Sequence, residues 1–277
     1  MKLGVFDSGL GGLLIARTIH QAMPEYDIVY FGDTLHLPYG NRSFDALYAY
    51  SCRAMDFLFG EMDCALVIVA CNTIGAGVLR RLQQDYLVKH YPERRILGVV
   101  VPTLECAIDR GYRSLGVIAT NFTINSGIYP EELRKINPAI EIYQMHTPLL
   151  VPLIENGGMK WIDEVLRDYL VPMKEKGVEC LILGCTHYVF IKDRIAKVMG
   201  AGVSLLAQDD IIPAKIDDYL RRHSEMDERL SRGGVIEFFV SDLTPDYVRT
   251  AGEIYGHDID VQALAFQVES NTYCLKE

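Results

Sequence analysis

The sequence lacks a long apolar run, an excess of basic residues and a leader-like first segment. No run approaches the roughly 18 apolar residues that a membrane-spanning helix requires. Lysine and arginine number 27 against 37 acidic residues, and this net charge of -10 argues against the basic stripe of a nucleic-acid surface. The chain opens on an apolar strand and a glycine-rich turn. We therefore expect a cytoplasmic protein that binds neither nucleic acid nor membrane.

Cysteine is informative because seven are present, an odd number. They lie mostly inside apolar segments, so we expect a reducing compartment and no disulfide framework. Hydrophobic residues make up 49% of the chain and charged residues 23%, which indicates a globular protein long enough for two domains with separate cores. We interpret five of the cysteines as small buried hydrophobic residues: Cys52, Cys64, Cys106, Cys180 and Cys274.

The other two cysteines end two similar apolar runs. One run ends in Cys71, and the other ends 114 positions later in Cys185. The repetition predicts two related halves, each with one thiol at the carboxyl end of a parallel strand, where α/β sheets bind ligands. Two further pairs of strand-like segments recur in the same order, at offsets of 112 from Leu3 to Leu115 and of 113 from Tyr30 to Tyr143.

Apolar strand-like segments alternate with helical patterns along the chain, which predicts an α/β fold of mainly parallel sheets flanked by helices. The duplication predicts two pseudosymmetric domains, residues 1–98 with 208–277 and residues 99–207. The tail is assigned to the first sheet because it holds no third copy of the cysteine pattern. Expected strands include residues 2–6, 27–31, 96–101, 114–119, 140–145 and 235–240. Expected helices include residues 43–61, 124–136 and 212–222, the last with Pro213 in its first turn, and one capped by Thr244; residues 148–157 are expected to form a loop.

The two halves differ around their thiols. Thr73, two residues after Cys71, corresponds to His187 in the second half, whereas Asp7 has no acidic counterpart there. Cys71 therefore has a candidate carboxylate partner and Cys185 a candidate imidazole partner. A thiol, with a pKa of about 8.5, needs such a partner or a helix amino terminus to act as a base near neutral pH. Alternatively, Asp7 is a turn residue and His187 an ordinary histidine at a helix start.

The glycine-rich stretch at residues 7–12 admits two interpretations. Its backbone amides at a helix start would suit an anion, or the stretch is a plain tight turn. It is not a dinucleotide-binding fingerprint, because Leu14 stands where the third glycine or an alanine is required. A zinc site from Cys180, Cys185 and His187 is disfavoured, because strand alternation sends the two cysteines to opposite sides. We expect no metal.

Five motifs span most of the chain: GVFDSGLGG at 4–12, PYG at 38–40, VACNT at 69–73, VPLIE at 151–155 and LGCTHY at 183–188. Together they resemble the glutamate racemases of the cofactor-independent aspartate/glutamate racemase superfamily. His187 in the last motif favours the glutamate branch over the aspartate racemases. The resemblance implies an active site between two pseudosymmetric domains and interconversion of L- and D-glutamate, without pyridoxal phosphate or metal.

The resemblance also implies a role for each matching residue. Cys71 and Cys185 are the two acid/base thiols, assisted by Asp7, Glu155 and His187. Inversion at a carbon needs a base on one face and an acid on the other, which facing thiols supply. A cytoplasmic homodimer that supplies D-glutamate for peptidoglycan, and so for the cell wall and cell shape, is implied as well. The implied substrate contacts are Asp7, Ser8, Pro38, Tyr39, Gly40, Cys71, Asn72, Thr73, Cys185, Thr186 and His187.

Some segments depart from the family pattern, and other functions stay open. We expect Ile74-Gly75 to alter the cavity wall beside Cys71; the other departures are Val101-Pro102-Thr103 and Val189-Phe190. One alternative is an aspartate racemase or a racemase of broader specificity within the superfamily. The other is a relative that binds a ligand without catalysis, which the two intact thiols and their different partners argue against.

Overall fold

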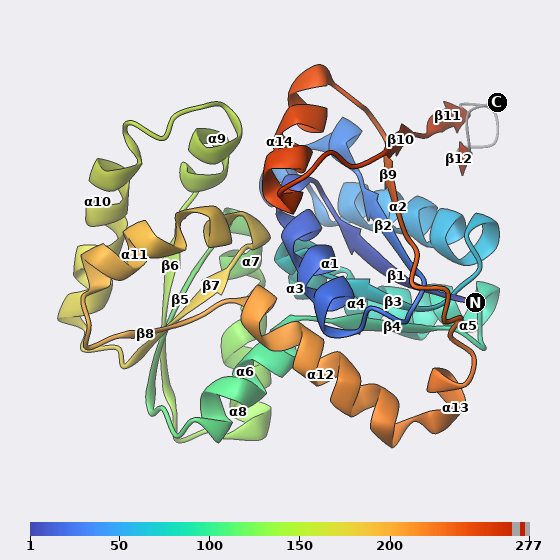
Figure 1. Ribbon diagram of the computed structural model, residues 1–277. Coiled ribbons are helices and arrows are strands. Elements are labelled where there is room, and N and C mark those ends of the chain that lie inside the picture. Colours follow the sequence, from blue (N-terminus) through green and yellow to red (C-terminus); the bar gives the residue numbers. More distant parts are fainter. Residues whose placement is uncertain (268–271, 275–277) are drawn as a thin grey trace.

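Two separate sheets of parallel strands organise the computed structural model, which describes residues 1–267 and 272–274 (Figure 1). Among these residues, the first sheet has the order β10 (Val261–Ala263), β9 (Ile236–Val240), β2 (Ile28–Gly32), β1 (Lys2–Asp7), β3 (Cys64–Val69) and β4 (Arg95–Gly98). The second sheet has the order β6 (Glu141–His146), β5 (Ser114–Ala119), β7 (Cys180–Gly184) and β8 (Ser204–Leu206).

The order of the strands repeats between the sheets. The order β2-β1-β3-β4 in the first sheet corresponds to β6-β5-β7-β8 in the second. This repetition confirms the predicted α/β fold with two related halves. The pairing register corrects one offset, because Leu3 pairs with residue 28 whereas Leu115 pairs with residue 142. The second strands are therefore related by 114 positions, so that Tyr30 corresponds to Gln144 rather than to Tyr143.

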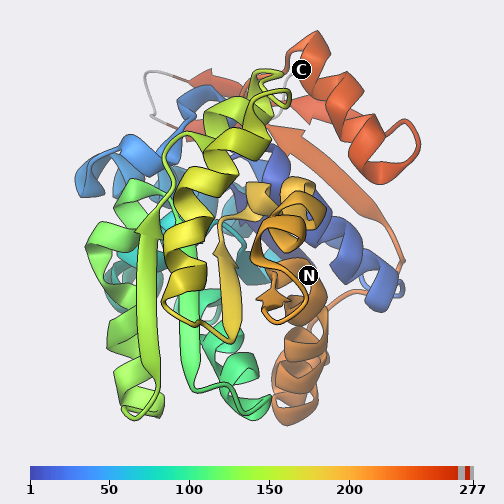
Figure 2. The same ribbon diagram turned by 90° about the vertical axis from the view of Figure 1, so that its left-hand side faces the viewer.

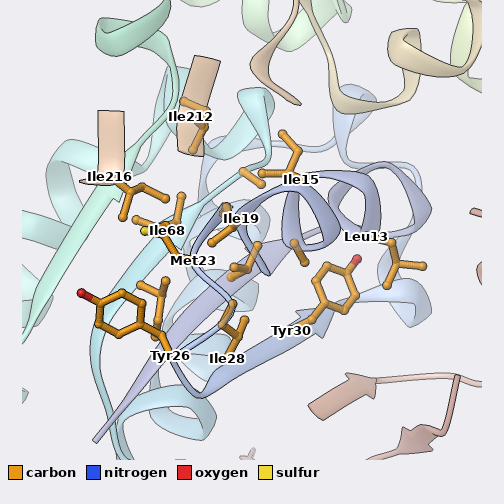
Figure 3. Packing of buried hydrophobic residues seen from close by; sticks show 14 of the residues in the cluster. Leu13, Ile15, Ile19, Met23, Tyr26, Ile28, Tyr30, Ile68, Ile212 and Ile216 are labelled. Atoms are coloured by element: carbon orange, nitrogen blue, oxygen red, sulfur yellow. The ribbon is translucent and has the colours of Figure 1, made fainter. Parts of the chain in front are cut away.

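Helices cover both faces of the first sheet, so its central strands are buried on both sides and read as continuous apolar runs. On one face lie α1 (Leu10–Ala22), α12 (Gln208–Arg222) and α14 (Pro245–Tyr255). There Ile15 and Ile19 share a hydrophobic cluster with Ile212 and Ile216 (Figure 3). The opposite face packs against α2 (Phe44–Asp56), the π-helical η3 (Phe57–Glu61), α3 (Asn72–Gly77), α4 (Leu79–Arg81), η4 (Leu82–Tyr86) and α5 (Leu87–His90).

The second sheet is also covered on both faces (Figure 2). One face packs against α6 (Val100–Asp109) and α8 (Ile128–Ile136), and the other against α9 (Leu150–Glu155), α10 (Ile162–Glu175) and α11 (Lys192–Met199). Two short helical segments, α7 (Asn121–Ser126) and η5 (Thr186–Ile191), follow β5 and β7. Cys180 packs in the hydrophobic cluster under α6 and α8, and Cys185 packs in the cluster under α9, α10 and α11. The two cysteines therefore lie on opposite sides, as strand alternation predicts.

Several predicted helices are present, one of them with its predicted cap at Thr244. The helix expected at residues 43–61 is formed by α2 and η3, and the Ser43 hydroxyl accepts a hydrogen bond from the amide of Ala46 at 3.3 Å. Helix α14 begins at Pro245, and Thr244 Oγ1 accepts from the amide of Tyr247 at 3.2 Å. The helix expected at 124–136 is divided into α7 and α8 at Gly127, which has a φ of 69°.

Other boundaries differ from the predictions in segments that contain proline, which in two cases lies in the first turn of a helix, where it is tolerated. The strand expected at residues 96–101 ends at Gly98, since α6 already begins at Val100 with Pro102 in its first turn. The loop expected at 148–157 contains α9, with Pro152 as its third residue. Helix α12 begins at residue 208 instead of 212, so Pro213 lies inside it and not in its first turn.

The tail completes the first sheet, as predicted. After α12 and the short α13 (Ser224–Asp227), strands β9 and β10 extend that sheet beyond β2. An antiparallel pair, β11 (Ala265–Gln267) and β12 (Thr272–Cys274), follows and was not predicted. The domain bounds of 1–98 with 208–277 and of 99–207 stay a prediction, and the side chain of Cys274 lies outside the described part. Within that part, no helix has the length and apolar character needed to cross a membrane.

Candidate active site

A cavity lies where the carboxyl ends of β1 and β3 in one sheet meet those of β5 and β7 in the other. Most of the residues predicted as substrate contacts line it. Those residues are Ser8, Pro38, Tyr39, Gly40, Cys71, Asn72, Thr73, Cys185, Thr186 and His187. Asp7 and Glu155 do not line the cavity and lie behind residues that do. The structure thus gathers both thiols at one cavity, one from each half of the chain.

Cys71 lies at the junction of β3 and α3 and is buried. Its thiol donates a hydrogen bond to Ser8 Oγ over 3.8 Å. Burial is the main reason that the pKa of Cys71 is raised, to about 12, and the nearby Asp7 carboxylate adds to the rise. The amide of Ile74 in the first turn of α3 acts in the opposite direction and favours the thiolate, as expected of a helix amino terminus, but burial outweighs it.

Asp7 ends β1 and is fully buried. Its Oδ2 atom accepts hydrogen bonds from the amides of Gly9 at 3.2 Å and Gly12 at 2.8 Å. The start of α1 therefore does hold an acidic group, but that group is the protein's own carboxyl. Burial raises the pKa of Asp7, although His187 and the two amides act in the opposite direction. Thr186 Oγ1 donates to Asp7 Oδ1 at 3.4 Å, which links this carboxyl to the other half.

Cys185 follows β7 and has an imidazole partner. Its sulfur lies 3.8 Å from His187 Nδ1, and the Nε2 atom of the same ring lies 2.8 Å from Glu155 Oε1. Burial by itself would lower the pKa of His187, but Cys185 and Glu155 hold it well above its usual value. A protonated His187 can donate to both neighbours. Glu155, in α9, therefore contacts the ring and not the cavity.

Hydrogen bonds at the cavity wall hold Asn72 and join the two halves. Asn72 Oδ1 accepts from Tyr129 Oη, in the other half, at 2.8 Å and from Gln208 Nε2, in its own predicted half, at 3.1 Å. The Asn72 Nδ2 atom is buried without a hydrogen-bond partner among the described residues. The hydroxyls of Thr73 and Thr120 lie 3.1 Å apart. An unpartnered donor in a polar cavity suits a carboxylate ligand.

The segment after β2 passes through η1 (Thr34–His36) and then forms one wall of the cavity with Leu37, Pro38 and η2 (Tyr39–Asn41). The Tyr39 hydroxyl donates to Asp33 Oδ2 at 2.5 Å, which fixes the ring from behind. At Gly40, an added Cβ atom would lie 2.7 Å from the Cβ of Thr120 in the other half. Glycine is therefore required at this position for the wall to approach the second sheet so closely.

Sequence reasoning missed several lining residues, among them Thr120, Asn121 and Thr147. The duplication contained the signal for two of them. Thr120 follows Ser8 by the offset of 112 that relates β1 to β5, and Thr147 follows Asp33 by the offset of 114 that relates β2 to β6. The second offset was not available from the sequence, because the tyrosine alignment placed these strands one residue out of register.

The departures from the family pattern lie mostly away from the cavity. Ile74 is fully buried in the hydrophobic core and does not line the cavity, so the expected change in the wall beside Cys71 is wrong. Val101 is partly exposed on α6. Phe190 approaches the site, because its ring lies edge-on to His187 with 6.4 Å between the ring centroids.

Comparison with known proteins agrees with this geometry. A glutamate racemase of Geobacter metallireducens is 35% identical over 275 residues, which cover 96% of this chain and 97% of that protein. The crystal structure of a glutamate racemase isoform from Bacillus anthracis superposes with a TM-score of 0.86 at 27% identity, covering 95% and 97% of the two chains. A glutamate racemase from Francisella tularensis in complex with D-glutamate superposes with a TM-score of 0.84 at 29% identity and the same coverage.

The resemblance that the motifs predicted is therefore confirmed over nearly the whole chain. A profile of Asp/Glu/Hydantoin racemases matches residues 14–208, which include both cysteines, His187 and most of the other cavity-lining residues. The chain belongs to the Asp/Glu/Hydantoin racemase family.

Proposed function

We propose that the protein is a glutamate racemase that interconverts L- and D-glutamate with two cysteine thiols. The observation that carries the proposal is the presence of Cys71 and Cys185 at one cavity, each at the end of an equivalent strand of the two related sheets. Racemisation removes a proton from one face of the α-carbon and returns a proton to the other face. One thiol in each half suits a base and an acid on opposite sides of the substrate.

The proposed reaction from L-glutamate uses Cys185 as the base. Its sulfur takes the α-proton, and the electron pair of the broken C–H bond remains on the substrate. Cys71 then donates its own proton to the opposite face, and the pair forms the new C–H bond of D-glutamate. The raised pKa of Cys71 keeps it protonated for this role. His187, whose pKa is also raised, can stabilise the charge on Cys185 while Glu155 orients the ring.

The reaction from D-glutamate reverses these roles. Cys71 must then act as the base, and the proposal assigns Asp7 to assist it. The Asp7 carboxyl lies close enough to Cys71 to raise the pKa of that thiol, and it also accepts a hydrogen bond from Thr186 Oγ1. Both proton transfers use side chains of the chain itself, and the proposal therefore requires neither pyridoxal phosphate nor a metal ion.

The remaining predicted residues are proposed to bind the substrate. Ser8, Thr73 and Thr186 present hydroxyl groups at the cavity, and Asn72 presents an amide whose nitrogen is unpartnered among the described residues. Pro38, Tyr39 and Gly40 form the wall opposite the second sheet. We further propose that the protein works as a cytoplasmic homodimer whose D-glutamate enters peptidoglycan synthesis.

Circular dichroism of L-glutamate incubated with the purified protein tests the function. The account predicts that the optical signal decays to zero without added cofactor, and that chelators leave the rate unchanged. Decay with L-aspartate at a comparable rate would favour the broader-specificity alternative. Binding of glutamate with no decay of its signal would favour a binding protein, and would refute the proposed activity.

A further inference from the structure

A buried carboxylate behind the cavity wall collects hydrogen bonds from three distant parts of the chain. Asp33 is fully buried at the end of β2. Its Oδ2 atom accepts from the hydroxyl of Tyr39, at 2.5 Å. Its Oδ1 atom accepts from Ser241 Oγ at 2.7 Å and from the hydroxyl of Tyr273 at 2.8 Å. The fourth side chain around this carboxylate, His36, places its Nδ1 atom 2.8 Å from Oδ2.

Tyr273 brings the end of the described chain into this network. It lies in β12, and its side chain is almost fully buried although the residue is close to the carboxyl terminus. Its ring packs on Phe31 of β2 in an edge-on contact, with 5.4 Å between the ring centroids. Its hydroxyl also lies 3.2 Å from His36 Nδ1. The β11–β12 pair lies beside α2 at the upper right of Figure 1, remote in sequence from the cavity wall.

Tyr39 transmits the position of Asp33 to the cavity. Its side chain lines the cavity, while its hydroxyl points back to the buried carboxylate. The next residue, Gly40, meets Thr120 so closely that the wall has little freedom to shift toward the other half. Movement of Tyr39 would therefore change the shape of the site directly. Despite burial, the pKa of Asp33 is lowered by His36, Tyr39 and Ser241, so the carboxylate is an ionised and strong acceptor.

We infer that Tyr273 is a positioning residue, which sets the cavity wall through Asp33 and Tyr39. Where the wall binds glutamate, this inference rests on the proposed function. Loss of the Tyr273 hydroxyl would remove one donor from Asp33 and loosen the contact that holds Tyr39. Loss of this hydroxyl should weaken substrate binding and leave proton transfer unchanged, because none of these hydroxyls contacts either thiol in the described part of the chain.

The first test is Tyr273→Phe, which keeps the ring against Phe31 and removes only the hydroxyl. We expect KM to rise about three- to tenfold for both enantiomers, with kcat within about twofold of the wild type. The matched control is Tyr86→Phe, because the buried Tyr86 hydroxyl donates to Asp56 in the same half without lining the cavity. Equal kinetic changes in both variants would mean that the Tyr273 effect is a general one on stability, and would overturn the inference.

The second test is a double-mutant cycle with Tyr39→Phe. If Tyr273 acts through Tyr39, adding Tyr273→Phe to Tyr39→Phe changes KM by less than about twofold, although each single change raises it. If the increase in KM of the double variant equalled the product of the two single increases, Tyr273 would act independently of Tyr39, and the inference would be overturned. Ser241→Ala removes another donor from the same Oδ1 atom and serves in the cycle if Tyr273→Phe is too unstable to assay.

Hydrogen exchange separates this inference from the proposed activity, because it needs no substrate. In the free protein, Tyr273→Phe should accelerate amide exchange at residues 34–41 severalfold, and Tyr86→Phe should leave it unchanged. Faster exchange in a protein that does not racemise glutamate would uphold the positioning role and refute the proposed function. Unchanged exchange at these residues would overturn the positioning role whatever the activity.

Discussion

Cys71 and Cys185 occupy equivalent positions in the two halves, yet different groups surround their sulfur atoms. Cys71 faces the Ser8 hydroxyl and lies near the buried Asp7 carboxyl, which together with burial favours the neutral thiol. Cys185 faces an imidazole whose pKa is raised. In the free protein, the neutral Cys71 thiol on one side of the cavity can donate a proton, and the Cys185 sulfur on the other side has the imidazole of His187 beside it.

This difference predicts the order of alkylation. Iodoacetamide near neutral pH should modify Cys185 well before Cys71, by about tenfold or more in rate, because the thiolate is the reactive form and the raised pKa of Cys71 keeps that thiol neutral. D-glutamate should protect Cys185. Cys106 is the control, since it is partly exposed outside the cavity and its labelling should not depend on glutamate. Mass-spectrometric mapping that found Cys71 to be the faster thiol would contradict the assigned environments.

The buried Asp7 carboxyl is expected to lower the stability of the protein at neutral pH while it assists the reaction. Burial raises its pKa above the ordinary 3.8, so the folded protein favours the protonated carboxyl. The contribution of the protonated Asp7 carboxyl to the free energy of unfolding is fully present below the ordinary pKa and is lost as the pH rises through the raised pKa. Asp7→Asn should therefore be more stable than the wild type at neutral pH, by about 1 kcal/mol in urea unfolding, and less active. An equal or greater stability of the wild type at neutral pH would show that the ionised carboxyl is well accommodated.

At the scale of elements, the cavity depends on the close approach of α1 to η5. At Gly11 of α1, an added Cβ atom would lie 2.3 Å from Thr186 Oγ1 and 2.8 Å from the amide nitrogen of His187. Both of these neighbours belong to the segment that follows Cys185. Helix α1 therefore positions the imidazole side of the site, although it contributes little to the cavity lining itself.

Gly11→Ala should consequently destabilise the protein by about 2–4 kcal/mol and lower kcat by tenfold or more, because η5 must move. Gly202→Ala is the matched control, since no atom lies within 4 Å of the Cβ it would add. Thermal unfolding and initial rates of racemisation measure the two effects. Wild-type activity in Gly11→Ala would mean that η5 shifts without consequence for the site.

The sequence was sufficient to predict the elements wherever apolar periodicity and caps were clear, as in the cysteine strands and the helix capped by Thr244. It was insufficient where proline obscured a helix start. Pro102 was expected to open its helix, which instead begins at Val100, and Pro152 was interpreted as a loop residue. Each proline lies in a first turn, where its missing amide has no helical role. The β11–β12 pair is short and supported by tertiary contacts, which local patterns do not contain.

At the scale of the whole molecule, the duplication predicted both the fold and the core of the site. Equivalent strands carry equivalent residues to a shared cavity, so the two thiols and the Asp7 and His187 partners could be named from the sequence. The hydrogen-bond network around Asp33 could not be predicted from the sequence. Asp33 lies more than two hundred positions from both Ser241 and Tyr273, and only the folded chain brings it together with them.

Each half of the molecule supplies one thiol that acts on one face of the α-carbon, and the fate of the α-proton tests this most directly. Protiated L-glutamate is incubated in D2O with the wild-type protein, and both enantiomers are analysed early by mass spectrometry after chiral separation. Two thiols on opposite faces predict that the D-glutamate formed carries deuterium while the remaining L-glutamate retains protium. Deuterium appearing equally early in both enantiomers, or protium carried into the product, would indicate a single base and contradict the account.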